Sequence, residues 1–164
     1  MSAFSHIDEK GNAIMVDVTD KAVTVREAEA EGTIFVGEEI LHLLTEGEIE
    51  KGDVLGTARI AGIMACKKTS DIIPLCHPLP LTKTSVEFEI LGEQKAVKAI
   101  CRVRTEGKTG VEMEALTGVS AALLTIYDMC KAISKSMVMG DIHLAEKSGG
   151  RSGHFVFGKE GTRL

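Results

Sequence analysis

The sequence of 164 residues has no tryptophan and one tyrosine, and aromatic side chains make up 4% of it. Its core must therefore be built from aliphatic side chains, with small residues that let the backbone pack closely. It also lacks an apolar run long enough to span a membrane, and its first residues have neither the basic start nor the apolar stretch of a signal peptide. We expect a cytoplasmic protein without a membrane partner.

Positive charge is scarce as well, because 19 basic side chains stand against 24 acidic ones and the formal net charge is -5. This balance excludes a general attraction to nucleic acid or to an anionic membrane. Any anionic ligand must instead be held by a local basic cluster.

No CxxC pair occurs among the four cysteines, which are Cys66, Cys76, Cys101 and Cys130. This absence argues against a structural zinc module and against a redox motif. His77 follows Cys76 directly, and adjacent side chains on a short loop rarely converge on one metal. We expect free buried thiols, no bound metal, and a hydrogen-bonding or proton-transferring role for His77.

The length and the 44% of apolar residues fit a single catalytic domain over residues 1–164, with flexible ends at 1–14 and 149–164. Apolar spacing predicts the regular elements. Strands are expected at 23–36, 86–90, 96–103 and 137–145, and helices at 37–47, 52–68 and 111–133. Three prolines within residues 73–80 forbid helix there. The order β-α-α-β-β-α-β predicts an α+β fold with a split βαβ sheet layered against helices.

Three groups of residues could carry chemistry. Asp128 and Lys131 are neighbours on one helix face, where they form either an exposed ion pair or a proton-transfer pair at a cleft. Lys51 precedes a helix whose free amides could hold a phosphate, but it could equally be a surface lysine. Glu112 and Glu114 open the long helix, and acids in a first turn are favoured by the helix dipole without any further role.

The role of two basic groups remains open, and one glycine-rich motif is rejected as a phosphate-binding loop. Lys67 lies at the end of the second predicted helix, where it complements the dipole. Lys147 and Arg151 belong to a glycine-rich tail that could fold over an anion or be a solvated end. The GKTG motif at 107–110 lacks the spacing of a Walker A loop, so we reject a P-loop.

Seven unbroken strings decide the family. They are MVDVTDK from Met15, KGDV from Lys51, ARIAGI from Ala58, IPLCHPL from Ile73, GKTGVEMEALT from Gly107, YDMCKA from Tyr127 and KSGG from Lys147. Together and in this order they closely resemble the MoaC family of cyclic pyranopterin monophosphate synthases in molybdenum cofactor biosynthesis. The resemblance runs from about residue 6 to residue 153, whereas the tail after Gly153 and the loop at 91–95 match no family string.

The resemblance implies a ferredoxin-like subunit in a homohexamer, a trimer of dimers with active sites at subunit interfaces. It also implies a lyase that converts a 3′,8-cyclised dihydro-GTP to cyclic pyranopterin monophosphate with loss of pyrophosphate. No redox cofactor is expected, although magnesium could accompany the triphosphate. The order of ring opening and phosphate cyclisation stays open.

The resemblance further assigns site residues. Asp128 is the expected catalytic acid/base, with Lys51 and Lys131 beside it. The expected substrate contacts are Leu75, Cys76, His77, Met113 and Glu114, with Glu112 next to them. Growing charge on a phosphate needs cations, for which the candidates are Lys51, Lys67, Arg26 and Lys147. The rival functions are a non-catalytic ligand-binding module and an RNA-binding sheet, and VEFEI and AICRV offer the latter a single aromatic side chain.

Overall fold

The computed structural model describes residues 6–8 and 10–159. Its elements, in chain order, are β1 (Thr24–Phe35), α1 (Glu38–Glu46), α2 (Val54–Cys66), α3 (Thr69–Ile72), β2 (Leu81–Leu91), β3 (Ala96–Gly107), α4 (Glu112–Cys130), β4 (Val138–Ser148) and β5 (Phe155–Val156). The α+β class expected from the sequence is confirmed.

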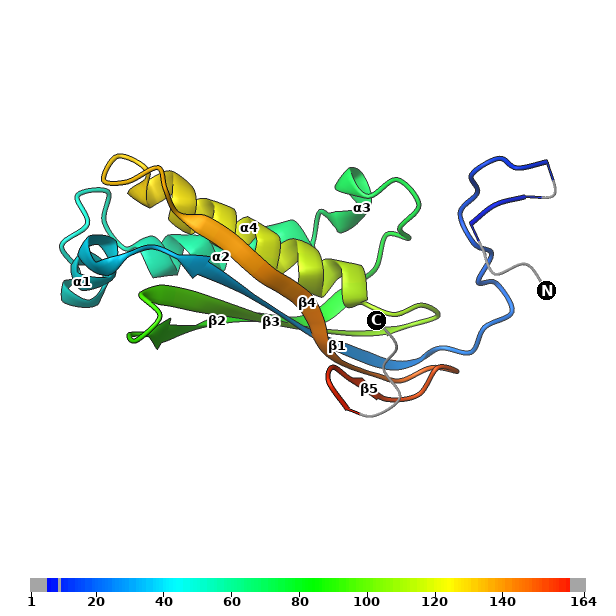
Figure 1. The fold of residues 1–164 in the computed structure, drawn as a ribbon. Coiled ribbons are helices and arrows are strands. Elements are labelled where there is room, and N and C mark those ends of the chain that lie inside the picture. The colour runs from blue at the N-terminus through cyan, green and yellow to red at the C-terminus, as the bar shows by residue number, and fades with distance from the viewer. Residues whose placement is uncertain (1–5, 9, 160–164) are drawn as a thin grey trace.

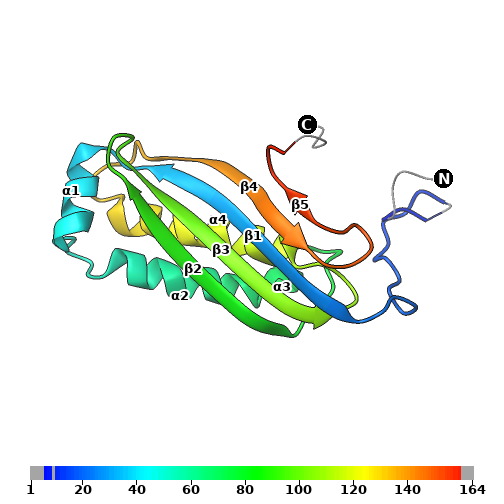
Figure 2. The ribbon, with the colours of Figure 1, turned by 90° about the horizontal axis from the view of Figure 1, so that it is seen from below.

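One antiparallel sheet with the order β2-β3-β1-β4-β5 forms the base of the fold. β3 lies between β1 and β2, and β1 lies between β3 and β4, so each half is a split βαβ unit of the ferredoxin-like kind. Both long helices, α2 and α4, cover the same face of the sheet (Figure 1). None of the helices formed by the described residues covers the opposite face (Figure 2).

Small and aliphatic residues fill the space between the sheet and the helices. Ala30, Ile34 and Leu123 are completely buried there. Gly32 lies under α4, and a Cβ atom at this position would come within 3 Å of the side chains of Val119 and Leu123. The shortage of aromatic residues is therefore met by close approach of the backbones, as expected.

The predicted elements are present, but three strands are longer than predicted. β2 begins at Leu81 instead of residue 86, β3 continues to Gly107 instead of residue 103, and β4 continues to Ser148 instead of residue 145. The first half of β2 reads LTKTS, whose mostly polar residues give no alternating apolar signal. β2 lies at the edge of the sheet, and its pairing with β3 fixes where it begins.

Two short elements were not predicted. α3 is a single helical turn, and β5 pairs with β4 through Glu146↔Val156 and Lys147↔Phe155. The glycine-rich stretch between the two paired segments signals a loop, and a strand of two residues carries no alternating pattern. The prediction of flexible ends falls in part on residues 1–5, 9 and 160–164, which lie outside the described residues.

The cysteines agree with the expectation of free thiols, except that one of them is only half-buried. All four thiols are free, and Cys66, Cys101 and Cys130 are buried, whereas Cys76 is half-buried. Within residues 6–8 and 10–159, no helix is long and apolar enough to cross a membrane.

Candidate active site

A cavity of about 300 Å³ opens at the N-terminal end of α4. Its volume is at the lower end of the range for small-molecule sites. The cavity is lined by His6, Val16, Val18, Lys21, Leu75, Cys76, His77, Leu79, Thr109, Gly110, Glu112, Met113 and Glu114. Every residue that the sequence proposed from the proline-rich loop and from the start of α4 is among them.

The proline-rich loop after α3 presents Cys76 and His77 to this cavity. Nε2 of His77 lies 2.8 Å from the carbonyl oxygen of Val16. Because a carbonyl oxygen can only accept, this ring nitrogen is protonated and donates a hydrogen bond to it. Burial raises the pKa of the Cys76 thiol, and the carboxylate of Glu114 adds to the shift. Cys76 is therefore a neutral thiol at pH 7 and not an activated nucleophile.

Glu114 is an acid held inside the protein. Only 4% of its surface is exposed, and burial raises the pKa of its carboxyl group, with a smaller contribution from the charge of Glu112. The N-cap residue Val111 makes no side-chain cap hydrogen bond, and a hydrogen bond from the backbone amide of Glu114 to its own carboxyl group offsets part of the rise in pKa. A buried carboxyl group with a raised pKa that faces a cavity is suited to carry and deliver a proton.

A second cluster lies at the other end of α4. Nζ of Lys131 is 2.6 Å from a carboxylate oxygen of Asp128, and Nζ of Lys51 donates to the backbone carbonyl of Asp128 at 3.0 Å. Lys131 lowers the pKa of Asp128, and Asp128 raises the pKa of Lys131. About half or more of both side chains is exposed, so within one chain the pair has the geometry of an exposed ion pair with both groups charged.

The two groups of predicted residues do not meet within one chain. Met113 and Asp128 are fifteen positions apart on one continuous helix, which places them about 22 Å from each other at 1.5 Å per residue. The structure thus gathers the expected substrate contacts at one end of α4, and it gathers the expected acid/base with its two lysines at the other end.

Comparison with known proteins identifies the family. The model of the MoaC family matches residues 15–150. The chain belongs to the MoaC family. It is 56% identical to proteins named cyclic pyranopterin monophosphate synthase from two strains of Clostridium perfringens, strain 13 / Type A and strain SM101 / Type A. Each alignment spans 153 residues, covering 93% of this chain and 97% of the relative, so the resemblance seen in the short strings is confirmed over nearly the whole length.

The remaining predicted cations of this MoaC chain lie outside the lining of the cavity. Lys67 caps the C-terminal end of α2, and Lys147 donates to the hydroxyl of Ser152. Arg26 donates to the carbonyl of Lys108 at 3.4 Å, and its buried Nε has no partner among the described residues. None of the three belongs to the cluster around Asp128.

The glycine-rich tail packs directly on Arg26. Gly149 and Gly150 have φ values of 92° and 71°, in the left-handed region that favours glycine. A Cβ atom at Gly150 would overlap the guanidinium group of Arg26. This part of the tail is therefore not simply a solvated end.

The start of α2 differs from the phosphate site considered above. The carboxylate of Asp53 accepts the amide of Gly56 at 2.8 Å and caps the helix. An acid thus occupies the position that an anion would need. Lys51 alone, through its side chain, remains available to a negative group at this end.

Several lining residues were not singled out from the sequence, namely His6, Val16, Val18, Lys21, Leu79, Thr109 and Gly110. Val16, Val18 and Lys21 belong to the string MVDVTDK, and Thr109 and Gly110 belong to GKTGVEMEALT. The strings that carried the resemblance were therefore also the signal that could have pointed to these residues. Within the described part of the chain, no cluster of three or more His, Cys, Asp or Glu residues could hold a metal ion.

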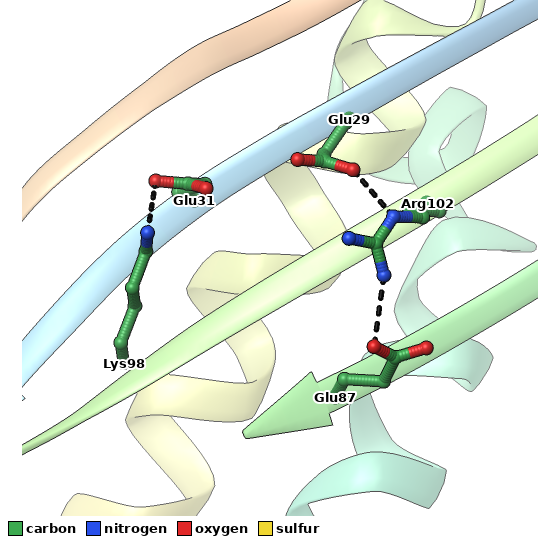
Figure 3. Close-up of polar contacts among 5 residues, drawn as sticks. All are labelled: Glu29, Glu31, Glu87, Lys98 and Arg102. Atoms are coloured by element: carbon green, nitrogen blue, oxygen red, sulfur yellow. Dashed lines mark hydrogen bonds and ion pairs between the residues drawn. The ribbon is translucent and has the colours of Figure 1, made fainter. Parts of the chain in front are cut away.

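A second hollow, of about 220 Å³, lies over the sheet strands and is lined mainly by charged residues. Within this lining, Arg102 pairs with Glu29, and Arg104 pairs with Glu27 at 3.4 Å. Beside the hollow, Arg102 also pairs with Glu87, and Lys98 pairs with Glu31 (Figure 3). Lys147 is the only predicted site residue in the lining. We therefore place the candidate active site at α4 and not in this hollow.

Proposed function

We propose that this chain converts (8S)-3′,8-cyclo-7,8-dihydroguanosine 5′-triphosphate to cyclic pyranopterin monophosphate and releases pyrophosphate. The observation that carries the proposal is the membership of the MoaC family, together with 56% identity over nearly the full length to relatives that bear the name of this synthase. The reaction uses a nucleotide made inside the cell, so a cytoplasmic location is part of the proposal.

The chemistry needs proton transfer and charge stabilisation. Opening one ring and closing another moves protons on and off nitrogen and oxygen, a task for groups with shifted pKa values, such as Glu114 and the pair Asp128 and Lys131. Formation of the cyclic phosphate requires a ribose hydroxyl to attack the α-phosphorus while pyrophosphate leaves. Lys51 and Lys131 are placed to stabilise the charge that grows on the phosphate oxygens.

Each active site is proposed to combine two copies of the chain. One chain alone keeps the cavity and the Asp128 cluster about 22 Å apart on α4. A second copy whose α4 runs antiparallel to the first would bring its own Asp128 to the cavity, and the two-fold symmetry would create two equal sites.

The outward face of the helix layer supports this arrangement. Between Glu114 and Asp128, α4 carries no charged side chain. Large apolar residues are nevertheless exposed on α2 and α4, where 65% of Ile60, 54% of Met64 and 55% of Leu124 is accessible. An uncharged face of this kind is suited to pack against its own copy. We propose a dimer through this face and a homohexamer of three such dimers.

Mixing inactive variants tests the shared site. If the two clusters come from different chains, subunits with His77→Ala and with Asp128→Ala form mixed dimers that contain one intact site. Random exchange in an equal mixture should then restore about a quarter of the wild-type activity. The matched control mixes Lys51→Ala with Asp128→Ala. These residues lie in the same cluster, so no intact site can form, and recovery of activity in this control would contradict the arrangement.

The reaction itself is tested with the purified protein and the cyclised triphosphate. Product and pyrophosphate should form without reductant, nicotinamide or flavin. Repeating the assay with a chelator decides whether magnesium must accompany the triphosphate. Strict dependence on a redox cofactor, or binding of the substrate without turnover, would refute the proposed activity.

A further inference from the structure

An extended segment before β1, residues 16–21, covers one side of the cavity, and we call it the strap. Val16 and Val18 are half-buried and line the cavity, whereas the alternate residues Asp17 and Thr19 are exposed. The chain here leaves the sheet at the start of β1 and continues away from it (Figure 1). The strap is thus a two-sided segment whose apolar side chains face the site.

Two side chains hold the strap by its backbone, one from the cavity wall and one from a residue next to it in sequence. Nε2 of His77 donates to the carbonyl of Val16 at 2.8 Å, and Nζ of Lys108 donates to the carbonyl of Thr19 at 2.6 Å. The donors come from the loop after α3 and from the loop before α4, so the strap is joined to two separate elements. The carbonyl of Lys108 in turn accepts a hydrogen bond from Arg26 on β1.

The strap also has a defined internal conformation. The carboxylate of Asp17 accepts the amide of Thr19 at 2.8 Å, and the amide of Lys21 donates to the carbonyl of Val18 at 3.0 Å. These bonds turn the chain and place Lys21 in the cavity lining. Its side chain is half-buried and takes part in none of the ion pairs of the described residues. A lysine in this situation is an attractive partner for an anionic ligand group.

We infer that Lys108 is a positioning residue that holds the strap over the cavity, so that Lys21 contacts a phosphate group of the substrate. This inference rests on the proposed function for the identity of the substrate. The anchoring of the strap is a property of the protein alone, so it can be tested separately. Neither Lys108 nor Lys21 is needed for the proton-transfer steps assigned to Glu114 and Asp128.

Steady-state kinetics test the role of the two lysines. Lys108→Ala should raise KM about tenfold and change kcat by less than about threefold, because it removes a charged hydrogen-bond donor that acts on substrate binding. Lys21→Met should raise KM similarly. Since Lys21 acts only when the strap is held, the double variant should be little worse than either single variant. Lys108→Arg should restore most of the affinity, and Lys10→Ala, a surface charge of the same N-terminal region, should match wild type.

Hydrogen exchange and anion binding test the strap without turnover. The amides of residues 16–21, followed by mass spectrometry, should exchange faster in Lys108→Ala than in wild type and should be unchanged in Asp128→Ala. The affinity for inorganic pyrophosphate, measured by calorimetry, should fall in Lys108→Ala and in Lys21→Met. An inactive wild-type protein would refute the proposed function. The exchange and pyrophosphate data would still show whether Lys108 holds the strap and whether Lys21 binds an anion.

Three results would overturn the inference. One is unchanged exchange of the strap in Lys108→Ala. Another is faster exchange with unaltered KM and unaltered pyrophosphate affinity, because the hydrogen bond would then serve the fold only. The third is full additivity of Lys108→Ala and Lys21→Met, which would show that the two lysines act independently.

Discussion

Replacing Gly118 by alanine should destabilise the protein, although alanine is the better helix former. Gly118 lies in the middle of α4 against α2. A Cβ atom there would lie 2.5 Å from Sγ of Cys66 and 2.7 Å from Sγ of Cys101. It would also lie 3.3 Å from the carbonyl oxygen of Gly62. Both sulfurs are buried and only 3.6 Å apart, so they have little space into which to retreat.

The magnitude follows from two opposing effects. Alanine in place of glycine favours a helix interior by about 0.5–1 kcal/mol. Forcing an additional methyl group into a packed core costs about 1–3 kcal/mol, and more where the neighbours cannot move. The added atom meets two buried sulfurs and a backbone oxygen, so we expect the cost of the overlap to exceed the gain in helix propensity. The free energy of unfolding should fall by about 1–2 kcal/mol and Tm by about 2–8 °C.

Scanning calorimetry at one fixed protein concentration measures this effect. Gly92→Ala in the β2–β3 hairpin is the matched control, since nothing lies within 4 Å of a Cβ atom there. Removing both sulfurs in a Cys66→Ala/Cys101→Ala background should make the same Gly118→Ala change less costly. A Gly118→Ala protein that melts at or above the wild-type temperature would refute this account of the α2–α4 contact.

Three further predictions concern Glu114, the pair of Asp128 and Lys131, and the outward helix face. Burial raises the pKa of Glu114, so the folded chain holds this proton more tightly than the unfolded chain, and stability is lost as pH rises from the ordinary glutamate value through the raised one. Glu114→Gln should therefore raise Tm at pH 7 and lose this advantage near pH 4, and a gain that is equal at both values would contradict the burial of a proton. Asp128→Ala and Lys131→Ala should each lower kcat about 100-fold without loss of fold by circular dichroism, and the double variant should be barely slower. Near-normal turnover in Asp128→Ala would show that Asp128 and Lys131 form only a structural ion pair. Leu124→Glu should dissociate the proposed oligomer, measured by light scattering, and an unchanged mass would exclude the outward face of α4 as the interface.

Local patterns in the sequence determined the larger elements. The apolar spacing of α4, the alternation in β1 and the prolines around Cys76 each reflect the geometry of a few adjacent residues, which the chain carries wherever it lies in space. The strings from MVDVTDK to KSGG determined the family in the same way. These features depend on residue type and order, so no tertiary contact was needed to see them.

Tertiary structure alone decided how the site is assembled. The helical pattern shows that Asp128 and Lys131 share a face, but only the packing shows that Glu114 is buried while Asp128 is exposed. The hydrogen bond from Lys108 to Thr19 joins residues that are 89 positions apart, which no local pattern relates. A periodic pattern tells which side of an element is apolar, but it does not tell which surface that side will meet. For this reason the sequence named the residues of both clusters, whereas the burial of Glu114 and the strap over the cavity emerged only from the folded chain.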